Sequence, residues 1–215
     1  MKVKRSKMFK VFFAWVMLIL LCLVKANASS VREISMDEML QNSQLVFEGK
    51  VIDVEAKENS QKRIHTYVTL KIRDIIKGEY YNNNIILRFL GCTVGETTLL
   101  ISDMVLPERG EQGIYFVESL ERMQVHPLYG WSQGHFIVGR DAAGAEIVMT
   151  NKRYPVKGLK SNISEEPLGK GEQSSQGLSK GVVRDLIVEQ KNNEVRGMRI
   201  DEFKNILYEK MRKKQ

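Results

Sequence analysis

The chain has 215 residues, of which 43% are hydrophobic and 27% are charged, which is enough for one domain with a sizeable core and added segments. Its 33 basic and 26 acidic residues give a formal net charge of +7 at pH 7. With two cysteines and three histidines, the composition argues against a disulfide-rich scaffold and against a cysteine- and histidine-rich metal site.

The first 28 residues predict a secretory signal peptide. A basic segment, Met1–Lys10, precedes an apolar run from Val11 to Val24, and Ala26-Asn27-Ala28 follows as a small-x-small cleavage site. The apolar run is too short to span about 30 Å of hydrocarbon. We therefore expect export to the periplasm or the medium, cleavage before Ser29, and no stable membrane insertion afterwards.

Removal of residues 1–28 changes the charge and the cysteine count. Six basic residues leave with it, so the mature chain carries 27 basic and 26 acidic residues, which argues against nucleic acid as a partner. Cys22 is also removed, and Leu20-Leu21 before it disfavours a lipid attachment site. Cys92 is left as a buried apolar side chain, an intermolecular partner or a reactive thiol.

Residues 35–90 predict one helix and three strands. Ser35 and Glu38 form a capping box, which predicts a helix to about Asn42. Alternation of apolar and polar residues from Leu45 predicts a long first strand, and β-branched and aromatic residues predict strands over 64–76 and 85–90.

Shorter strands follow. We expect residues 91–95 to connect, and residues 97–101 and 113–117 to be extended. Residues 135–138 and 145–149 flank a turn and predict a hairpin. Since no helix-length insertion separates these strands, residues 29–156 are predicted to form an antiparallel β-barrel or sandwich.

The C-terminal part changes in composition. Residues 157–181 are rich in Gly, Ser, Lys, Gln and Glu, which predicts a disordered loop. Within 182–215 we expect a hairpin of residues 186–190 with 194–198, then a helix capped by Asp201. Its cationic end at 210–214 either is solvated or contacts anionic lipid. The expected buried stripe of the helix is Phe203, Ile206, Leu207 and Met211.

The order of these patterns over residues 43–120 resembles the netrin-like domain, the OB-type barrel of tissue inhibitors of metalloproteinases. The segments that carry the resemblance are 43–51, 66–72, 75–78, 91–92 and 110–117. The chain is also similar to a group of uncharacterised secreted bacterial proteins, with which it shares Lys77-Gly78 at a strand end, a glycine pair near Gly91, and the step Gln133-Gly134-His135-Phe136.

This resemblance implies a mainly β, OB-like (netrin-like) antiparallel barrel with a short N-terminal helix and a C-terminal helix. The inhibitors ligate the protease zinc through an N-terminal cysteine. Here the expected first residue is Ser29, and Cys92 has no second cysteine to pair with, so that mechanism is not implied.

The segment Tyr129–Gly134 is the candidate binding loop, because two aromatic side chains between glycines suit ligand recognition at a rim. The ligand-binding residues we select are Tyr129, Trp131, Gln133 and His135. The alternative is that Trp131 covers the core and the glycines only shape the turn. His126 and His135 flank the loop, but their spacing does not indicate a metal site, and we expect no cofactor.

The sequence carries no G-x-S-x-G, P-loop or G-x-G-x-x-G motif, so no catalytic residue is selected. We expect a non-enzymatic binding or protein-interaction module with a secreted or envelope protein as partner. The alternatives are an envelope hydrolase and an inhibitor-like partner of a secreted peptidase. The inhibitor would act through a protruding loop near residues 91–97.

Overall fold

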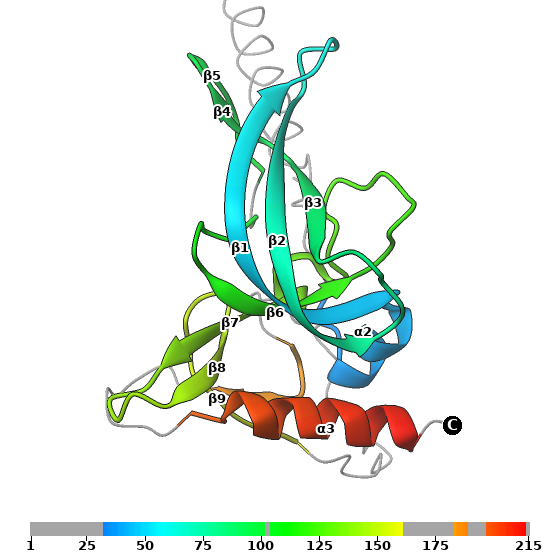
Figure 1. The fold of residues 1–215 in the computed structure, drawn as a ribbon, viewed down its shortest axis with the longest axis vertical. Coiled ribbons are helices and arrows are strands. Elements are labelled where there is room, and N and C mark those ends of the chain that lie inside the picture. Colours follow the sequence, from blue (N-terminus) through cyan, green and yellow to red (C-terminus); the bar gives the residue numbers. More distant parts are fainter. Residues whose placement is uncertain (1–31, 102–103, 161–182, 189–196, 214–215) are drawn as a thin grey trace, which may run out of the picture. The chain divides into compact units, whose positions relative to one another are not determined.

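The computed structural model describes residues 32–101, 104–160, 183–188 and 197–213, and the predicted signal peptide lies outside them. The described chain is mainly β, with one helix before and one after the strands (Figure 1). No helix among these residues is long and apolar enough to cross a membrane. The elements are α2 (Met36–Asn42), β1 (Leu45–Glu58), β2 (Ile64–Lys77), β3 (Asn84–Leu90), β4 (Cys92–Val94), β5 (Thr97–Leu99), β6 (Gln112–Val117), the 3-10 helix η1 (Trp131–Gly134), β7 (His135–Arg140), β8 (Glu146–Thr150), β9 (Val156–Leu159), β10 (Leu186–Val188) and α3 (Ile200–Arg212).

Six strands form one antiparallel sheet in the order β3-β2-β1-β6-β7-β8. The long strands β1 and β2 curve together (Figure 1). Three register irregularities interrupt their pairing. Such irregularities bend a strand and increase its twist. Strand β1 thereby pairs with β2 along most of its length and with β6 at its first residues.

Helix α2 confirms the predicted start and end, with half of the capping box in place. The Ser35 hydroxyl accepts a hydrogen bond from the Glu38 amide at 3.1 Å. The Glu38 carboxylate turns instead to Tyr129 and Arg32. At the other end the ammonium of Lys77 donates to the carbonyls of Leu40 and Ser43, so a lysine of β2 satisfies the C-terminal carbonyls of α2.

The short strands differ from the sequence prediction in two places. Residues 92–94, expected to be part of a connector, form β4 and pair with β5 as a separate two-stranded hairpin. Strand β5 ends at Leu99 rather than at 101. The predicted hairpin of residues 135–138 with 145–149 is confirmed as β7 and β8.

The C-terminal part needs two corrections. Residues 156–159, where the disordered loop was expected to begin, form β9, and residues 161–181 lie outside the described part. Strand β10 pairs with β9, and residues 189–196, which include most of the predicted hairpin of 186–190 with 194–198, lie outside the described part. Helix α3 begins at Ile200 after Arg199, which places Asp201 in the first turn, where its charge favours the helix dipole.

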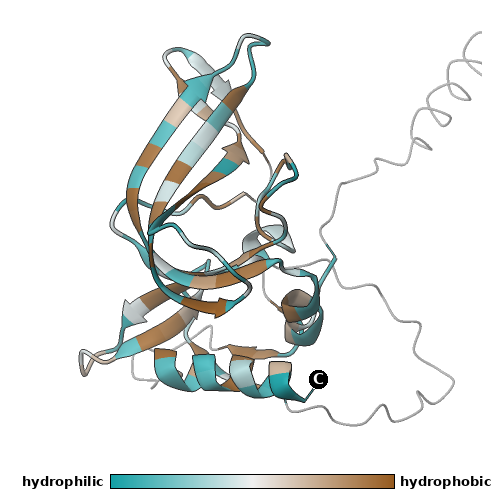
Figure 2. Ribbon diagram, turned by 45° about the vertical axis from the view of Figure 1, so that its right-hand side comes forward, coloured by the Kyte–Doolittle hydropathy of each residue, from teal (hydrophilic) through white to brown (hydrophobic). Residues whose placement is uncertain are grey.

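Two hydrophobic cores lie on the two faces of the sheet. One core is enclosed by β1, β2, β3, β6 and Leu128 and holds Phe47, Tyr115 and Phe89. The other joins the opposite face to α2, α3 and β9–β10 and holds Val46, Phe116 and Phe203. Figure 2 shows the apolar and polar residues alternating along the long strands. Alternation sends neighbouring residues of one strand to opposite faces, so β1 and β6 supply both cores.

Two glycines leave space for aromatic rings of the first core to lie over the backbone. Gly49 and Gly113 are opposite each other in β1 and β6. A methyl group on Gly113 would lie 2.5 Å from the Phe136 carbonyl oxygen and 3.0 Å from the Tyr115 hydroxyl. The rings of Phe47 and Tyr115 stack over this position with centroids 5.4 Å apart.

We expect Gly113→Ala to lower the free energy of unfolding by roughly 1 to 3 kcal/mol, because the added methyl meets backbone that cannot move aside. Gly158→Ala is the matched control, since its added methyl meets only Ile187 at the ordinary distance of 3.7 Å. Urea denaturation of both variants measures the difference. Equal midpoints would show that the glycine pair is not a packing requirement.

Candidate functional site

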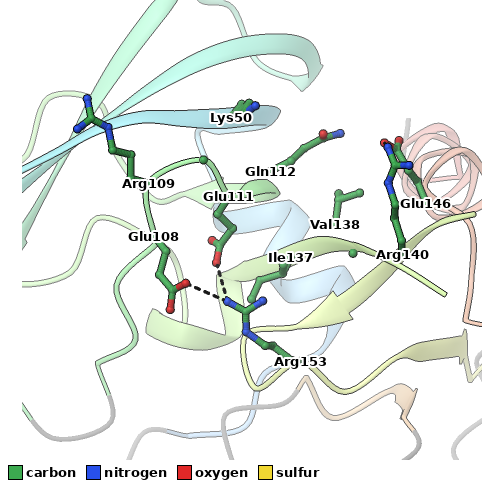
Figure 3. A pocket seen from close by; sticks show the side chains of 12 residues that line it. Lys50, Glu108, Arg109, Glu111, Gln112, Ile137, Val138, Arg140, Glu146 and Arg153 are labelled. Carbon is green, nitrogen blue, oxygen red and sulfur yellow. Dashed lines mark hydrogen bonds and ion pairs between the residues drawn. The ribbon is translucent and has the colours of Figure 1, made fainter. Parts of the chain in front are cut away.

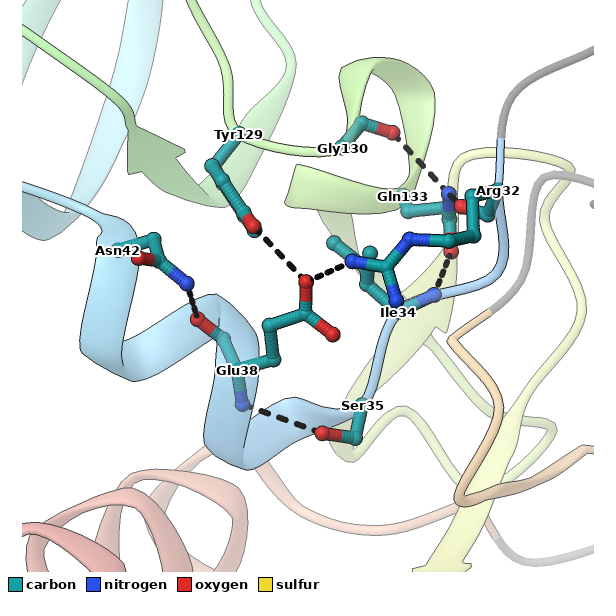
Figure 4. A network of polar contacts seen from close by, with 8 residues as sticks. All are labelled: Arg32, Ile34, Ser35, Glu38, Asn42, Tyr129, Gly130 and Gln133. Carbon is teal, nitrogen blue, oxygen red and sulfur yellow. Dashed lines mark hydrogen bonds and ion pairs between the residues drawn. The ribbon is translucent and has the colours of Figure 1, made fainter.

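The predicted binding loop 129–134 is largely an internal connection. Residues Trp131–Gly134 form η1, in which Ser132, Gln133 and Gly134 are buried. Gln133 is 2% exposed; its Oε1 accepts from the Ile34 amide at 3.1 Å, and its Nε2 donates to the carbonyl of Arg32 at 2.9 Å (Figure 4). The loop therefore attaches residues 32–34 to the sheet.

Tyr129 takes part in the same network. Its hydroxyl donates to Oε1 of Glu38 at 3.0 Å, and Arg32 contacts the same carboxylate oxygen (Figure 4). Burial and the hydrogen bond to Glu38 raise the pKa of Tyr129. The polar tip of this tyrosine is therefore committed to holding α2 and not turned to an external ligand.

His135 is fully inside the protein. It is 1% exposed, its Nε2 lies 2.8 Å from Oε1 of Glu111, and its ring stacks on Tyr115 with centroids 5.1 Å apart. Burial, with a smaller effect of Glu111, raises the pKa of Tyr115 well above its ordinary value. His135 and Glu111 thus form a buried acid–base pair that faces aromatic side chains.

His126 fills the space beneath Trp131. Its ring stacks on Trp131 with centroids 5.5 Å apart and meets Phe89 edge-on at 5.0 Å. Its Nδ1 accepts from the Leu128 amide at 3.2 Å. Burial, and secondarily the charge of His135, lowers the pKa of His126 to about 3. The neutral ring is a packing element that supports the half-buried Trp131.

The described residues show no metal-binding group, and they place the candidate thiol, Cys92, at the start of β4. Among the described residues no three His, Cys, Asp or Glu side chains gather as a metal-binding group. Cys92, the candidate reactive thiol, is a free cysteine at the start of β4, where it is half-buried. Its φ of 118° lies in the left-handed region, so the chain bends sharply between β3 and the hairpin.

A polar pocket of about 340 Å³ lies beside the loop before β6 (Figure 3). Its charged groups mainly bind one another. Arg153 lies 3.1 Å from Oε2 of Glu108 and 3.8 Å from Oε2 of Glu111, and Arg140 lies 3.6 Å from Glu146. These pairs involve five of the charged residues that line the pocket; Arg109 pairs with Asp53, and Lys50 also lines the pocket.

A larger groove, of about 500 Å³, lies between β3 and the loop 118–127. Three of its apolar side chains face solvent: Met123 is 79% exposed, Ile86 62% and Leu120 37%. The loop is held to β3 by a hydrogen bond from the Leu90 amide to the Val125 carbonyl at 3.0 Å. Several exposed apolar residues around one concavity are typical of an interaction surface.

Sequence reasoning did not find this groove. Ile86 occupies an outward position of a strand whose buried positions are Ile85, Leu87 and Phe89. A large apolar residue at such a position was the available signal. The contribution of Leu120 and Met123 was invisible, because they lie in a segment with no regular pattern.

The hairpin of β4 and β5 is a second exposed feature. The hydroxyls of Thr93 and Thr98 lie 3.0 Å apart across it, and its tip is Gly95-Glu96. Leu100, directly after β5, is 83% exposed. The region near 91–97, where a protruding loop was expected, is therefore a regular hairpin open to solvent along Thr93 and residues 95–98.

Comparisons with known proteins return no match: no family model, no curated protein and no solved structure is similar to this chain. The case for function therefore rests on the geometry alone.

We expect acid to destabilise the protein through His126. Its pKa is about 3 when folded and about 6.5 when unfolded, so the unfolded chain binds more protons as pH falls from about 6.5 towards 3. The stability is fully present above about pH 6.5 and decreases below it by up to a few kcal/mol. His126→Asn keeps an acceptor near Nδ1 but does not titrate. Urea denaturation at several pH values between neutral and acidic should show that the free energy of unfolding falls less steeply with pH for this variant than for the parent. An identical pH dependence would show that His126 does not cause the loss of stability.

Gln133→Leu should lower the free energy of unfolding by roughly 1 to 3 kcal/mol, because the buried amide of Ile34 loses its acceptor and the part-buried carbonyl of Arg32 loses its donor. Gln61→Leu, at an exposed turn, is the control and should change stability by less than about 0.5 kcal/mol. Thermal denaturation distinguishes them. An unaffected Gln133→Leu protein that no longer binds its partner would restore the loop as a ligand site.

Proposed function

We propose that this protein is an exported, non-enzymatic interaction module that binds a secreted or envelope protein through the groove between β3 and the loop 118–127. The observation that carries the proposal is the exposure of Ile86, Leu120 and Met123 around one concavity at the edge of the sheet. Single exposed apolar residues are ordinary, whereas a group around a concave surface marks a contact site.

We further propose that the strands form an OB-like, netrin-like arrangement. Support comes from β1, which is long, bent by irregularities, and paired with β2 on one side and β6 on the other. Support for export comes from residues 1–28, whose basic, apolar and small-residue segments follow one another in the order of a signal peptide.

A separate observation supports the inhibitor-like alternative. The solvent-exposed β4–β5 hairpin and Leu100 are the kind of protrusion with which an inhibitor-like protein enters the cleft of a peptidase. The hydrolase alternative is less favoured, because the carboxylate of Glu111 is taken by His135 and Arg153 inside the polar pocket.

The test compares two exposed positions by chemical crosslinking in cells that export the protein. Met123→Asp should reduce capture of the groove partner at least about tenfold, since a charge replaces an apolar contact among the exposed side chains of the groove. Leu100→Asp, on the hairpin, should leave that capture unchanged. The N-terminal residue of the recovered protein reports on cleavage before Ser29.

The reverse pattern, loss with Leu100→Asp only, would favour the inhibitor-like reading. Equal capture by parent and both variants would reject the groove. Since both side chains are exposed, neither substitution should change the urea midpoint, and that measurement accompanies each capture.

A further inference from the structure

We propose that the partner contributes an extended peptide segment that adds to the free edge of β3 as a new strand, with an acidic side chain beside Arg88. The inference rests on the proposed interaction function and names the binding mode at the same groove. Strand addition obtains affinity from main-chain hydrogen bonds and specificity from alternate side chains.

The first argument is the direction of the backbone groups of β3. In an antiparallel pair, alternate residues turn both N–H and C=O to the partner strand, and the residues between them turn both away. Asn83 and Gly91 bond to β2, through Ile72 and Ile64 respectively. Ile86 and Arg88, at the intermediate positions, therefore direct their N–H and C=O groups to the free edge.

The ends of this edge are already occupied. At one end the Tyr80 hydroxyl donates to the Asn84 carbonyl at 3.1 Å, and at the other the Leu90 amide donates to Val125. Between these contacts, no described residue accepts from or donates to the outward groups of Ile86 and Arg88. A partner strand of about five residues spans such an edge.

The second argument is the pair of surfaces that such a strand meets. The groove floor includes Ile85, Leu87 and Val117, which belong to the first hydrophobic core. A peptide paired with β3 sends every second side chain towards this floor and the others beside Ile86 and Arg88. The fitting pattern is an apolar side chain facing the floor, with an apolar and an acidic neighbour on the two flanking positions.

The acidic preference follows from Arg88. Its guanidinium contacts Sδ of Met123 at 3.8 Å, and no carboxylate among the described residues pairs with it. The other arginine of the groove, Arg122, already binds Glu118 at 3.2 Å. An unpaired cation on an edge strand discourages pairing with other chains in general. A peptide with a carboxylate directly opposite the cation gains an ion pair, so it is bound in preference to peptides without one.

The experiment measures binding of fluorescent synthetic peptides to the purified exported protein. Each peptide carries valine facing the groove floor and isoleucine beside Ile86, with threonine at the remaining positions and either glutamate or lysine beside Arg88. The parent should bind the glutamate peptide at least about fivefold more tightly than the lysine peptide. Arg88→Glu should reverse this preference, which a general loss of structure would not do.

Two further arms test the main-chain contacts. Ile86→Pro removes an outward N–H and should weaken binding about tenfold, whereas Ile86→Thr retains the N–H and most of the affinity. Proline is tolerated on an edge strand when its nitrogen faces outward, so the fold should persist. The second arm leaves the protein unchanged: N-methylation of a peptide amide that faces β3 should abolish binding, and N-methylation of the next amide should not.

The outcomes separate this inference from the proposed function. Equal affinity of both N-methylated peptides, or of Ile86→Pro and Ile86→Thr, overturns strand addition, and an unreversed charge preference overturns the role of Arg88. Absence of peptide binding while Met123→Asp still abolishes partner capture shows that a folded surface occupies the groove. That result would support the proposed interaction function and overturn the proposal of strand addition.

Discussion

The structure depends on β1 and β6 using both of their faces. Phe47 and Tyr115 point into one core, while Val46 and Phe116 point into the other. A shift of one residue in the β1–β6 register would exchange the two sets and leave both cores without their large side chains. The opposed glycines Gly49 and Gly113 leave space for the rings that lie over this pair.

The helices and the N-terminal segment attach to that sheet by polar contacts as well as apolar ones. Lys204 of α3 pairs with Glu48, which is buried in β1, and with Asp74 of β2 at 2.9 Å. Lys77 holds the end of α2, and Gln133 holds residues 32–34. Moving α3 away would leave the buried carboxylate of Glu48 without its cation, which is costly. The ion pair and the two sets of hydrogen bonds therefore fix the positions of α3, α2 and residues 32–34 on the sheet.

The candidate site lies at the edge of the sheet, beside β3. Among the described strands, β3 pairs with β2 alone, and the chain after β6 leaves the sheet at Val117 and returns at Leu128. The excursion approaches β3 again at Val125 and encloses the groove. An edge with unused backbone groups is a template for pairing with another chain, and exposed apolar residues beside it favour a contact, which is why this edge is the strongest candidate site of the described chain.

The aromatic loop that looked most suited to binding makes mainly internal contacts. A Tyr-Gly-Trp segment between glycines serves equally to close a core, and the choice depends on what lies beneath it. His126 under Trp131, and Gln133 reaching residues about a hundred positions earlier, make it a structural clamp. Neither contact follows from local sequence, because both join segments that are distant along the chain.

The sequence by itself determined the elements whose signal is local. The Ser35 cap, the alternation from Leu45, the strand end at Lys77-Gly78 and the stripe of Phe203 and Leu207 all correspond to elements of the structure. Tertiary structure alone decided the pairing of β10 with β9, the burial of His135 against Glu111 and the opening beside Ile86. The physical reason is that periodicity and capping depend on neighbouring residues, whereas pairing partners and concave surfaces depend on contacts between remote segments.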